Sequence, residues 1–577
     1  MNETPHVPQP EIPPQTPPQP AAPPSSQPVP PPQSQTVPPE QPRSPIFAYA
    51  VPQPSSPPVL ANRRDSVFRL LTILAAILFA DFALWGQFNL GFAIATFAVT
   101  AVGVVYLLPR PMKLPPFALF CLVCALALSA TFARTADAGT KLLCFAVILF
   151  LMGAFYCQSC GVTRYDFGTY QMAGDVLRTL FIIPLQFVAK PFQAIKQTKT
   201  GETKHSTGLK VLAGVLIALP VLLIVVPLLA QADAAFAGTL DKIGNNLFPW
   251  IVKIIVGLLL SLFLFSLFFA LKKGLATQEP AADGSIYRQG VHFADPVVVN
   301  SFFGAIALFY LIYLFSQTAY FFTVFQGILP AGYSFNHSEY ARRGFFEMST
   351  IAGINLVLIF LGTLLVKRKE GKIPLSTRLF SAFICLFTLL LIGTALAKMG
   401  LYIDNSGLTR LRVVTSLFMV ALCVCFVCVL VRLFLPRFPY AKVILAFSCL
   451  LLLGTAAVDI DTVIADYNVT AFEEGRLDHV DVSLLEELSD GAVPSLIQLL
   501  DSPNEEAAAQ ARTALWRRFQ NRYEVNENGE AVPFHEKSFT QYNYAAHEAD
   551  RLLRENYLRF QNADAEYDYS SPYFSRS

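Results

Sequence analysis

Long apolar runs separated by short polar connections fill the chain from about residue 60 to residue 458. A hydrocarbon core about 30 Å thick is crossed by about 20 residues of helix. Helix is required because lipid offers no hydrogen-bond partner to an open backbone. The pattern predicts about eleven spanning helices, at 66–86, 90–108, 115–133, 142–160, 210–230, 248–271, 298–318, 347–366, 377–397, 411–435 and 440–458.

Two hydrophilic parts flank this predicted bundle of residues 60–458. Residues 1–59 hold 22 of the 41 prolines, which predicts a disordered, cytoplasmic tail. Residues 459–577 predict a small helical domain, with two short helices broken at Ser489-Asp490-Gly491, a helix that follows Ser502-Pro503-Asn504, and a last helix at 541–561. The expected fold class is all-α: a polytopic transmembrane helix bundle with a helical C-terminal soluble domain.

Composition and charge support this division. Apolar residues make up 54% of the chain and charged residues 15%, whereas soluble domains carry about 25% charged residues. From Asp459 to the end there are 23 Asp and Glu against 10 Lys and Arg, a net charge of −13 that leaves +15 for the rest. All ten cysteines lie between Cys121 and Cys449, so no disulfide framework is expected in the acidic domain.

The distribution of basic residues predicts the orientation. Arg63, Arg64 and Arg69 flank the first span, which places the N-terminus in the cytoplasm of a bacterial cell. An odd number of spans then puts the acidic C-terminal domain outside the plasma membrane. Trp85 and Trp250 fall at predicted outer ends, as an aromatic belt requires.

The stretch 171–209 is too polar and too rich in proline to span. One interpretation is an interfacial segment in contact with anionic lipid on the cytoplasmic side. The alternative is a helix packed on the inner rim of the bundle. The lipid bilayer is the one partner that the sequence predicts. We expect no nucleic-acid partner, and protein partners stay open.

Two ionisable residues lie inside predicted spans, near their outer ends. Asp81 predicts either an interfacial or helix-pairing role or a functional site, and Lys253 either reaches toward water or belongs to such a site. None of the seven histidines falls within a predicted span, which disfavours an intramembrane metal or haem centre. We therefore expect no cofactor, and no catalytic motif is evident.

A charged motif precedes the eighth predicted span, with adjacent arginines at Arg342 and Arg343 bracketed by Glu339 and Glu347. It predicts either an anion-binding element at the outer mouth or a salt-bridge network that holds helix ends together. The run from Glu339 to Glu347 resembles a signature of a bacterial membrane-protein family, domain of unknown function 4173. Gly407 to Arg412 and Asp461 to Asn468 are similar to two further segments of that family. The resemblance implies a multi-pass bacterial membrane protein and supplies no activity.

These motifs all map to the predicted outer face. We expect a polar cluster there, made of Glu339, Arg342, Arg343, Glu347, Arg410, Arg412, Asp461 and Tyr467. Three functions remain open. The first is a non-enzymatic envelope or signalling component, which the sequence favours slightly. The second is a transporter or lipid-handling protein, and the third is an intramembrane enzyme acting on a lipid-linked substrate.

Overall fold

The computed structural model describes residues 63–108, 112–189, 233–277, 292–325 and 337–561, with isolated positions at 218, 225 and 229. Within these ranges, ten helices are long and apolar enough to cross a membrane. They coincide with ten of the eleven predicted spans, so the protein is an all-α, membrane-embedded protein. The predicted span at 210–230 and the proline-rich tail at 1–59 lie outside the described residues, apart from those isolated positions.

The first group of helices packs around a core rich in phenylalanine, which includes Phe92, Phe132, Phe155 and Phe269. Its elements are α1 (Arg63–Phe79), η1 (Ala80–Trp85), α2 (Leu90–Leu107), α3 (Pro116–Ala130), η2 (Thr131–Ala133), α4 (Ala138–Ser159), α9 (Ala234–Lys273) and η4 (Leu275–Thr277). Helices α1 and α9 approach closely at Gly257, where a Cβ would lie 2.7 Å from the Cα of Ile77. A small residue is needed at such a crossing.

The segment after α4 lies against this first group. It comprises α5 (Met172–Leu177), η3 (Arg178–Ile182) and α6 (Ile183–Gln186). Leu180 packs on Gly153 of α4, and the Ser266 hydroxyl of α9 donates to the Pro184 carbonyl at 2.7 Å. Residues 172–187 therefore pack on the bundle, and contact of the stretch 171–209 with anionic lipid stays a prediction. The residues beyond 189 in that stretch lie outside the described part.

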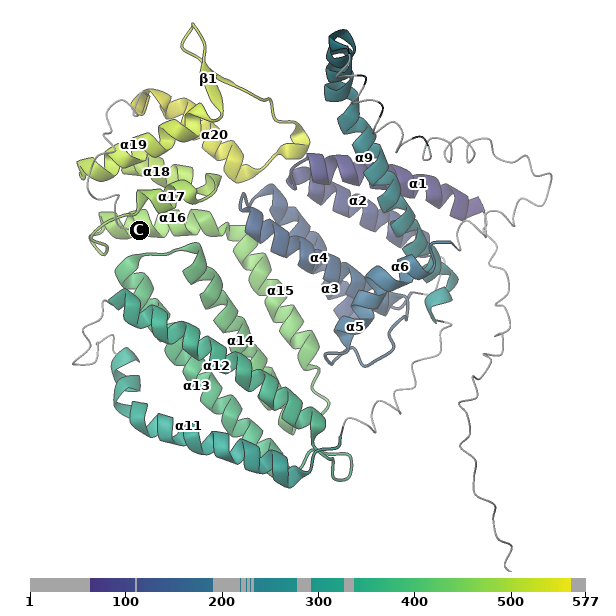
Figure 1. Cartoon of the computed structure of the whole chain (residues 1–577), viewed down its shortest axis with the longest axis vertical. Coiled ribbons are helices and arrows are strands. Elements are labelled where there is room, and N and C mark those ends of the chain that lie inside the picture. The colour runs from purple at the N-terminus through teal and green to yellow at the C-terminus, as the bar shows by residue number, and fades with distance from the viewer. Residues whose placement is uncertain are drawn as a thin grey trace, which may run out of the picture. The chain divides into compact units, whose positions relative to one another are not determined.

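The second group contains α11 (Pro296–Phe325), α12 (His337–Leu365), α13 (Leu375–Ser406) and α14 (Arg410–Phe434), which lie side by side in Figure 1. A hydrogen-bonded chain ties three of them together: Tyr310 donates to Asn355 at 2.6 Å, and Asn355 donates to Thr388 at 2.9 Å. Helix α13 continues to Ser406, well past the predicted end at 397. Helix α15 (Tyr440–Val458) packs on α14, α3 and α4.

The C-terminal domain begins directly after α15. Its elements are α16 (Ile460–Glu473), α17 (Val482–Glu487), η5 (Asp490–Ala492), α18 (Val493–Leu499), α19 (Glu505–Gln520), β1 (Tyr523–Val525), β2 (Ala531–Pro533), η6 (Phe539–Gln541), α20 (Tyr544–Asn556) and η7 (Tyr557–Arg559). The predicted break at Ser489-Asp490-Gly491 and the Asn504 cap are confirmed, with Asn504 accepting from the Ala507 amide at 3.0 Å. The antiparallel β1–β2 hairpin was not predicted.

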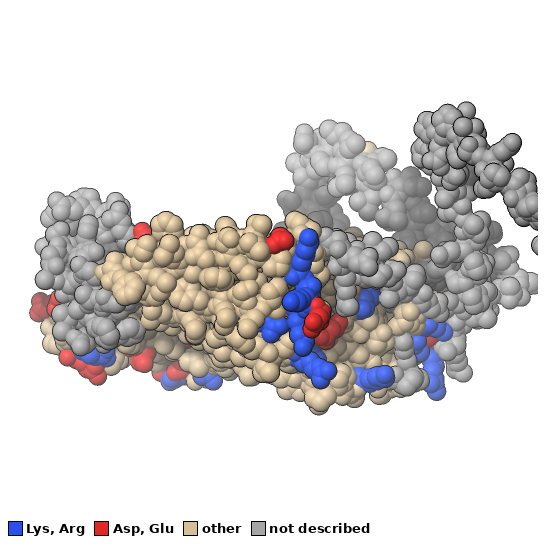
Figure 2. Space-filling model, turned by 90° about the horizontal axis from the view of Figure 1, so that it is seen from below, with Lys and Arg blue, Asp and Glu red and all other residues tan. Residues whose placement is uncertain are grey.

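The surface of the described spans is largely apolar, as expected for a surface in contact with lipid. Large apolar side chains on the spans point outward, such as Leu70, Phe309 and Phe315, which are 63%, 71% and 77% exposed. Figure 2 shows a broad surface made of residues other than Lys, Arg, Asp and Glu, with charged side chains in one band and along its edges. A surface of this kind is stable in hydrocarbon and unstable in water.

Candidate functional site at the bundle–domain junction

Polar side chains from the helix bundle and from the C-terminal domain meet near the point where α15 passes into α16. We call this set the junction; it consists of Asn89, Thr135, Asp137, Lys141, Arg410, Asp459, Asp461 and Asn543. Most of these side chains are buried or half-buried. Buried polar groups are costly unless they are paired, so such a cluster fixes the two parts against each other.

Arg410 is the cation at the centre of the junction. It stands at the first turn of α14, and its Nε donates to the Asp461 carboxylate at 2.6 Å while a second nitrogen contacts the other carboxylate oxygen. Its Nη2 also lies 3.5 Å from Asp137, the residue that caps α4 by accepting from the Thr140 amide. Arg410 thus joins three elements: α14, α16 and the start of α4.

Asp461 is almost fully buried, at 1% exposure, and also accepts from the Ser489 amide at 2.8 Å. Burial by itself raises the pKa of this carboxyl, but the hydrogen bonds from Arg410 and Ser489 outweigh burial and hold the pKa below its ordinary value. Asp461 therefore stays charged and bonded.

The pKa of Asp459 is shifted in the opposite direction. It is buried, its Oδ1 accepts weakly from the Thr135 hydroxyl at 3.5 Å, and its Oδ2 has no hydrogen-bond partner among the described residues. Burial, and then the negative charges of Asp461 and Asp137, raise the pKa of Asp459 above its ordinary value. Its backbone has φ +65°, a left-handed value that is strained in a residue with a Cβ.

Two asparagines complete the connection on the other side. Asn543 caps α20 and donates to the carbonyls of Thr135 at 2.6 Å and Phe132 at 3.1 Å. Asn89, between η1 and α2, donates to the Gln541 carbonyl at 3.1 Å and accepts from Lys141 at 2.6 Å. The segment around η6 is therefore attached to the ends of α2 and α3.

Of the residues of the predicted polar cluster, the structure brings two into contact, and the placement of the cluster on the outer face stays a prediction. These two are Arg410 and Asp461. Arg412 instead contacts the end of α13: it donates to the Ser406 and Gly407 carbonyls and lies over the Tyr402 ring, 3.8 Å from its centroid. Tyr467 instead contacts Arg476, at 5.4 Å.

The membership of the four charged-motif residues in this cluster stays a prediction. Glu347 is exposed on α12, and the side chains of Glu339, Arg342 and Arg343 lie outside the described residues. The backbone order places the start of α12 at the same end as Ser406, because α12 and α13 are joined by a short connection and pack antiparallel.

Asp81 and Lys253 form an ion pair, with 2.5 Å between Nζ and Oδ1. This geometry corresponds to the helix-pairing interpretation of Asp81, since η1 and α9 are the elements joined. Within the described part of the chain, neither side chain forms a hydrogen bond or ion pair with a member of the junction set.

Sequence reasoning missed Asp137, Asp459, Asn89 and Asn543 as members of a shared site. A local signal existed for Asp137 and Asn543, because each precedes a helix in a capping position. No local sequence pattern indicates that Asn543 contacts the Phe132 carbonyl, just after the end of α3. That contact depends on how the chain returns to the bundle.

The groups of the junction include a carboxyl whose protonation can change. Asp459 can take up or release a proton next to a fixed Arg410–Asp461 pair, which changes the net charge between domain and bundle by one. No group of three His, Cys, Asp or Glu side chains suited to a metal ion occurs within the described ranges.

Comparison with known proteins gives one match. A family model described as Domain of unknown function (DUF4153) matches residues 121–499, which covers the junction residues on α4, α14 and α16. The resemblance to domain of unknown function 4173 is not shown by this comparison. Searches against curated proteins and against solved structures find no match to the chain.

Proposed function

Because this chain belongs to the family described as Domain of unknown function (DUF4153), we propose its role from its own geometry. It is a non-enzymatic component of the bacterial cell envelope that couples its membrane bundle to an acidic, extracytoplasmic helical domain. The observation that carries this proposal is the junction, where buried and directional contacts tie the domain to three separate places on the bundle.

The contacts of the junction suit coupling better than simple anchoring. A domain needs only its covalent link to α15 to remain at the membrane. Here Arg410, Asn543 and Asn89 add hydrogen bonds between segments more than 50 residues apart in the chain. A displacement of α2, α4 or α14 is therefore transmitted to α16 and α20, because packed elements shift as units.

The charge of the domain supports an outward-facing, protein-binding role. Its formal charge is −13, from 23 acidic and 10 basic residues. Exposed acids occur on several of its elements, including Glu474, Asp501 and Glu527. Such a surface repels an anionic membrane and attracts basic partners. The excess of Lys and Arg in the connections at the other ends of the spans supports placing the domain outside the cell.

Orientation is tested first, with reporters fused after Ser577. A phosphatase that is active only outside the cytoplasm should be active, and a reporter that requires the cytoplasm should be silent. The reverse result overturns the extracytoplasmic placement and, with it, the proposed role.

The coupling is tested by complementation of a strain that lacks the chain. R410Q/D461N removes the central pair of the junction, whereas R476Q/E474Q removes an exposed pair in the same domain, in which the atoms lie 2.7 Å apart. Exposed ion pairs contribute little. At equal membrane levels, R476Q/E474Q should restore the wild-type envelope composition and R410Q/D461N should not. Full restoration by R410Q/D461N, or solute transport or lipid-substrate turnover by the purified chain in vesicles, contradicts the proposal.

A further inference from the structure

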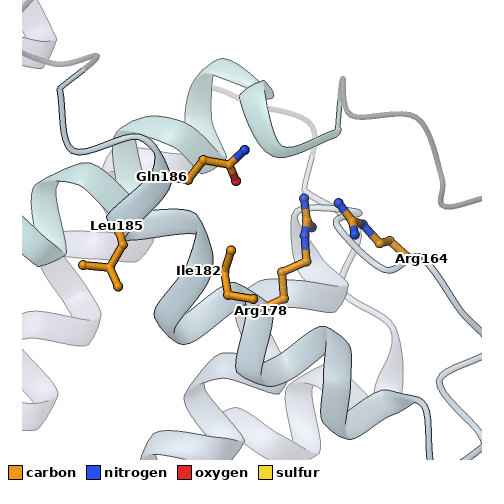
Figure 3. Close-up of a pocket in the computed structure, with 5 residues that line it drawn as sticks. All are labelled: Arg164, Arg178, Ile182, Leu185 and Gln186. Atoms are coloured by element: carbon orange, nitrogen blue, oxygen red, sulfur yellow. The ribbon is translucent and has the colours of Figure 1, made fainter. Parts of the chain in front are cut away.

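A hollow of about 630 Å³ opens beside the segment that follows α4. Two arginines line it, Arg164 from the loop after α4 and Arg178 from the start of η3, together with Ile182, Leu185 and Gln186. Figure 3 shows the two guanidinium groups side by side, while the other three side chains follow along η3 and α6. The hollow therefore has a cationic end and a mainly apolar wall.

The arginines are held in place by the packed backbone around Asp175. The Asp175 carboxylate accepts from the amides of Arg164 at 3.0 Å and Tyr165 at 3.2 Å, which fixes the loop on α5. Arg178 is only 6% exposed. The two guanidinium groups both line this end of the hollow. An anion between two guanidinium groups gains charge-assisted hydrogen bonds from both.

The apolar wall continues onto the outside of the segment. Leu177, Phe181, Ile182 and Leu185 are each half or more exposed, although they flank residues buried against α4 and α9. The helices α5 and α6 thus present one face to the bundle and one apolar face away from it.

The depth of these groups follows from the packing partners. Leu180 contacts Gly153, which precedes the end of α4 at Ser159 by six residues, or about 9 Å of helix. Pro184 likewise contacts Ser266, inside the end of α9 at Lys273. Arg164 lies beyond the end of α4. The Arg164 guanidinium, with that of Arg178 beside it (Figure 3), therefore lies near the level of the membrane surface, whereas Leu180 and Pro184 lie at the level of the hydrocarbon.

We propose that this hollow binds the phosphate of an anionic phospholipid between Arg164 and Arg178. Its acyl chains lie along Ile182 and Leu185, and the Gln186 amide contacts the polar part of the lipid. The vertical order of charge and apolar surface matches the order of phosphate and acyl chain in a lipid, which a soluble phosphate compound lacks. This inference is independent of the role proposed for the junction.

The test uses the full-length chain in neutral detergent, titrated with phosphatidylglycerol or phosphatidylcholine, with bound lipid counted by native mass spectrometry. Wild-type protein should bind phosphatidylglycerol more tightly than phosphatidylcholine. R164Q/R178Q should weaken phosphatidylglycerol binding by about tenfold or more, because each cation near a membrane surface contributes appreciably to lipid affinity. The control R437Q, an exposed arginine in the connection between α14 and α15, should bind as the wild type does.

Two further measurements complete the test: lipid binding by the single variant R164Q, and competition with inorganic phosphate. Because Arg178 is buried, its replacement can impair folding, so R164Q alone, in the more accessible loop, is measured beside it and should weaken binding several-fold. Equal phosphatidylglycerol binding by R164Q and wild type overturns the proposal. Displacement of the lipid by millimolar inorganic phosphate also overturns it, since the site would then recognise a soluble anion.

Discussion

Lys253 and Asp81 join α9 to η1 by an ion pair with 2.5 Å between Nζ and Oδ1. The Trp250 and Trp85 rings lie 4.6 Å and 5.4 Å from the same ammonium. At the other end of this antiparallel pair of helices, Asp65 bonds to Lys272 at 3.1 Å. The register of α1 against α9 is therefore fixed by charge at both ends, with the close approach at Gly257 between them.

Separating Lys253 from Asp81 should destabilise the protein, because either single change leaves a half-buried charge without its partner. We expect D81N and K253Q each to lower the free energy of unfolding by about 1–2 kcal/mol, and D81N/K253Q to lower it by less than the sum. Denaturant unfolding of the full chain in detergent measures all three. K113Q, an exposed lysine, is the control. Strictly additive losses would show that the two residues do not interact.

Features that depend on a local run of residues could be predicted, whereas most contacts between residues far apart in the chain could not. The ten spans within the described residues could be predicted closely, because 20 apolar residues leave a segment no stable place but lipid. Arg410 and Asp461 could be predicted to meet, since both stand at helix ends on one face. Asp81 and Lys253 were each identified, but not as a pair, since nothing in a sequence gives the rotation of one helix against another. Asn543 was missed because its partner carbonyls are 411 and 408 residues away.

Asp459 and Asp461 should respond to neutralisation with opposite signs. D461N removes a charged acceptor from Arg410 and the Ser489 amide, so at pH 7 we expect a loss of about 2 kcal/mol. D459N removes a buried charge that the site disfavours, and asparagine tolerates a left-handed backbone, so at pH 7 it should raise the stability. The melting temperatures of the two variants and the wild type at pH 7 test this pair.

The pH dependence of each effect follows from the direction of the pKa shift. The pKa of Asp461 is lowered in the folded state, so its stabilisation is present above the ordinary aspartate pKa of about 3.9 and is lost as the pH falls through the lowered value. The pKa of Asp459 is raised, so its cost disappears as the pH falls below the raised value. The gain of D459N should therefore shrink on mild acidification, before the deficit of D461N does. A gain that persists unchanged to pH 4 contradicts the raised pKa.

Asn543 should hold α20 on the bundle. N543A removes a helix cap and two donors to buried carbonyls, and we expect a loss of about 2–3 kcal/mol. Hydrogen exchange should rise in both α20 and residues 131–137. The control is N556A, in which the amide lost is bonded to the Leu552 carbonyl and to Arg559, both close to it in the chain. Faster exchange confined to α20 would show that Asn543 acts as a cap and not as a link.

Gly407 connects α13 to α14 in a conformation that only glycine adopts without cost, with φ +73°. A Cβ there would lie 2.5 Å from the Asn468 Oδ1, the atom that accepts the Leu408 amide at 2.6 Å. G407A therefore adds a collision to the backbone strain. Gly475 also has a positive φ, +71°, but open space around its Cβ position.

The two alanine variants compare a positive-φ position that has this collision with one that lacks it. G475A should lose about 1 kcal/mol from the backbone alone, and G407A should lose at least about 1–2 kcal/mol more, because Asn468 must leave its hydrogen bonds to Leu408. Since Arg410 follows three residues later, G407A should also speed hydrogen exchange at the start of α14 and α16, which G475A should leave unchanged. Equal losses for the two variants would mean that the Asn468–Leu408 contact does not position Arg410 at the junction.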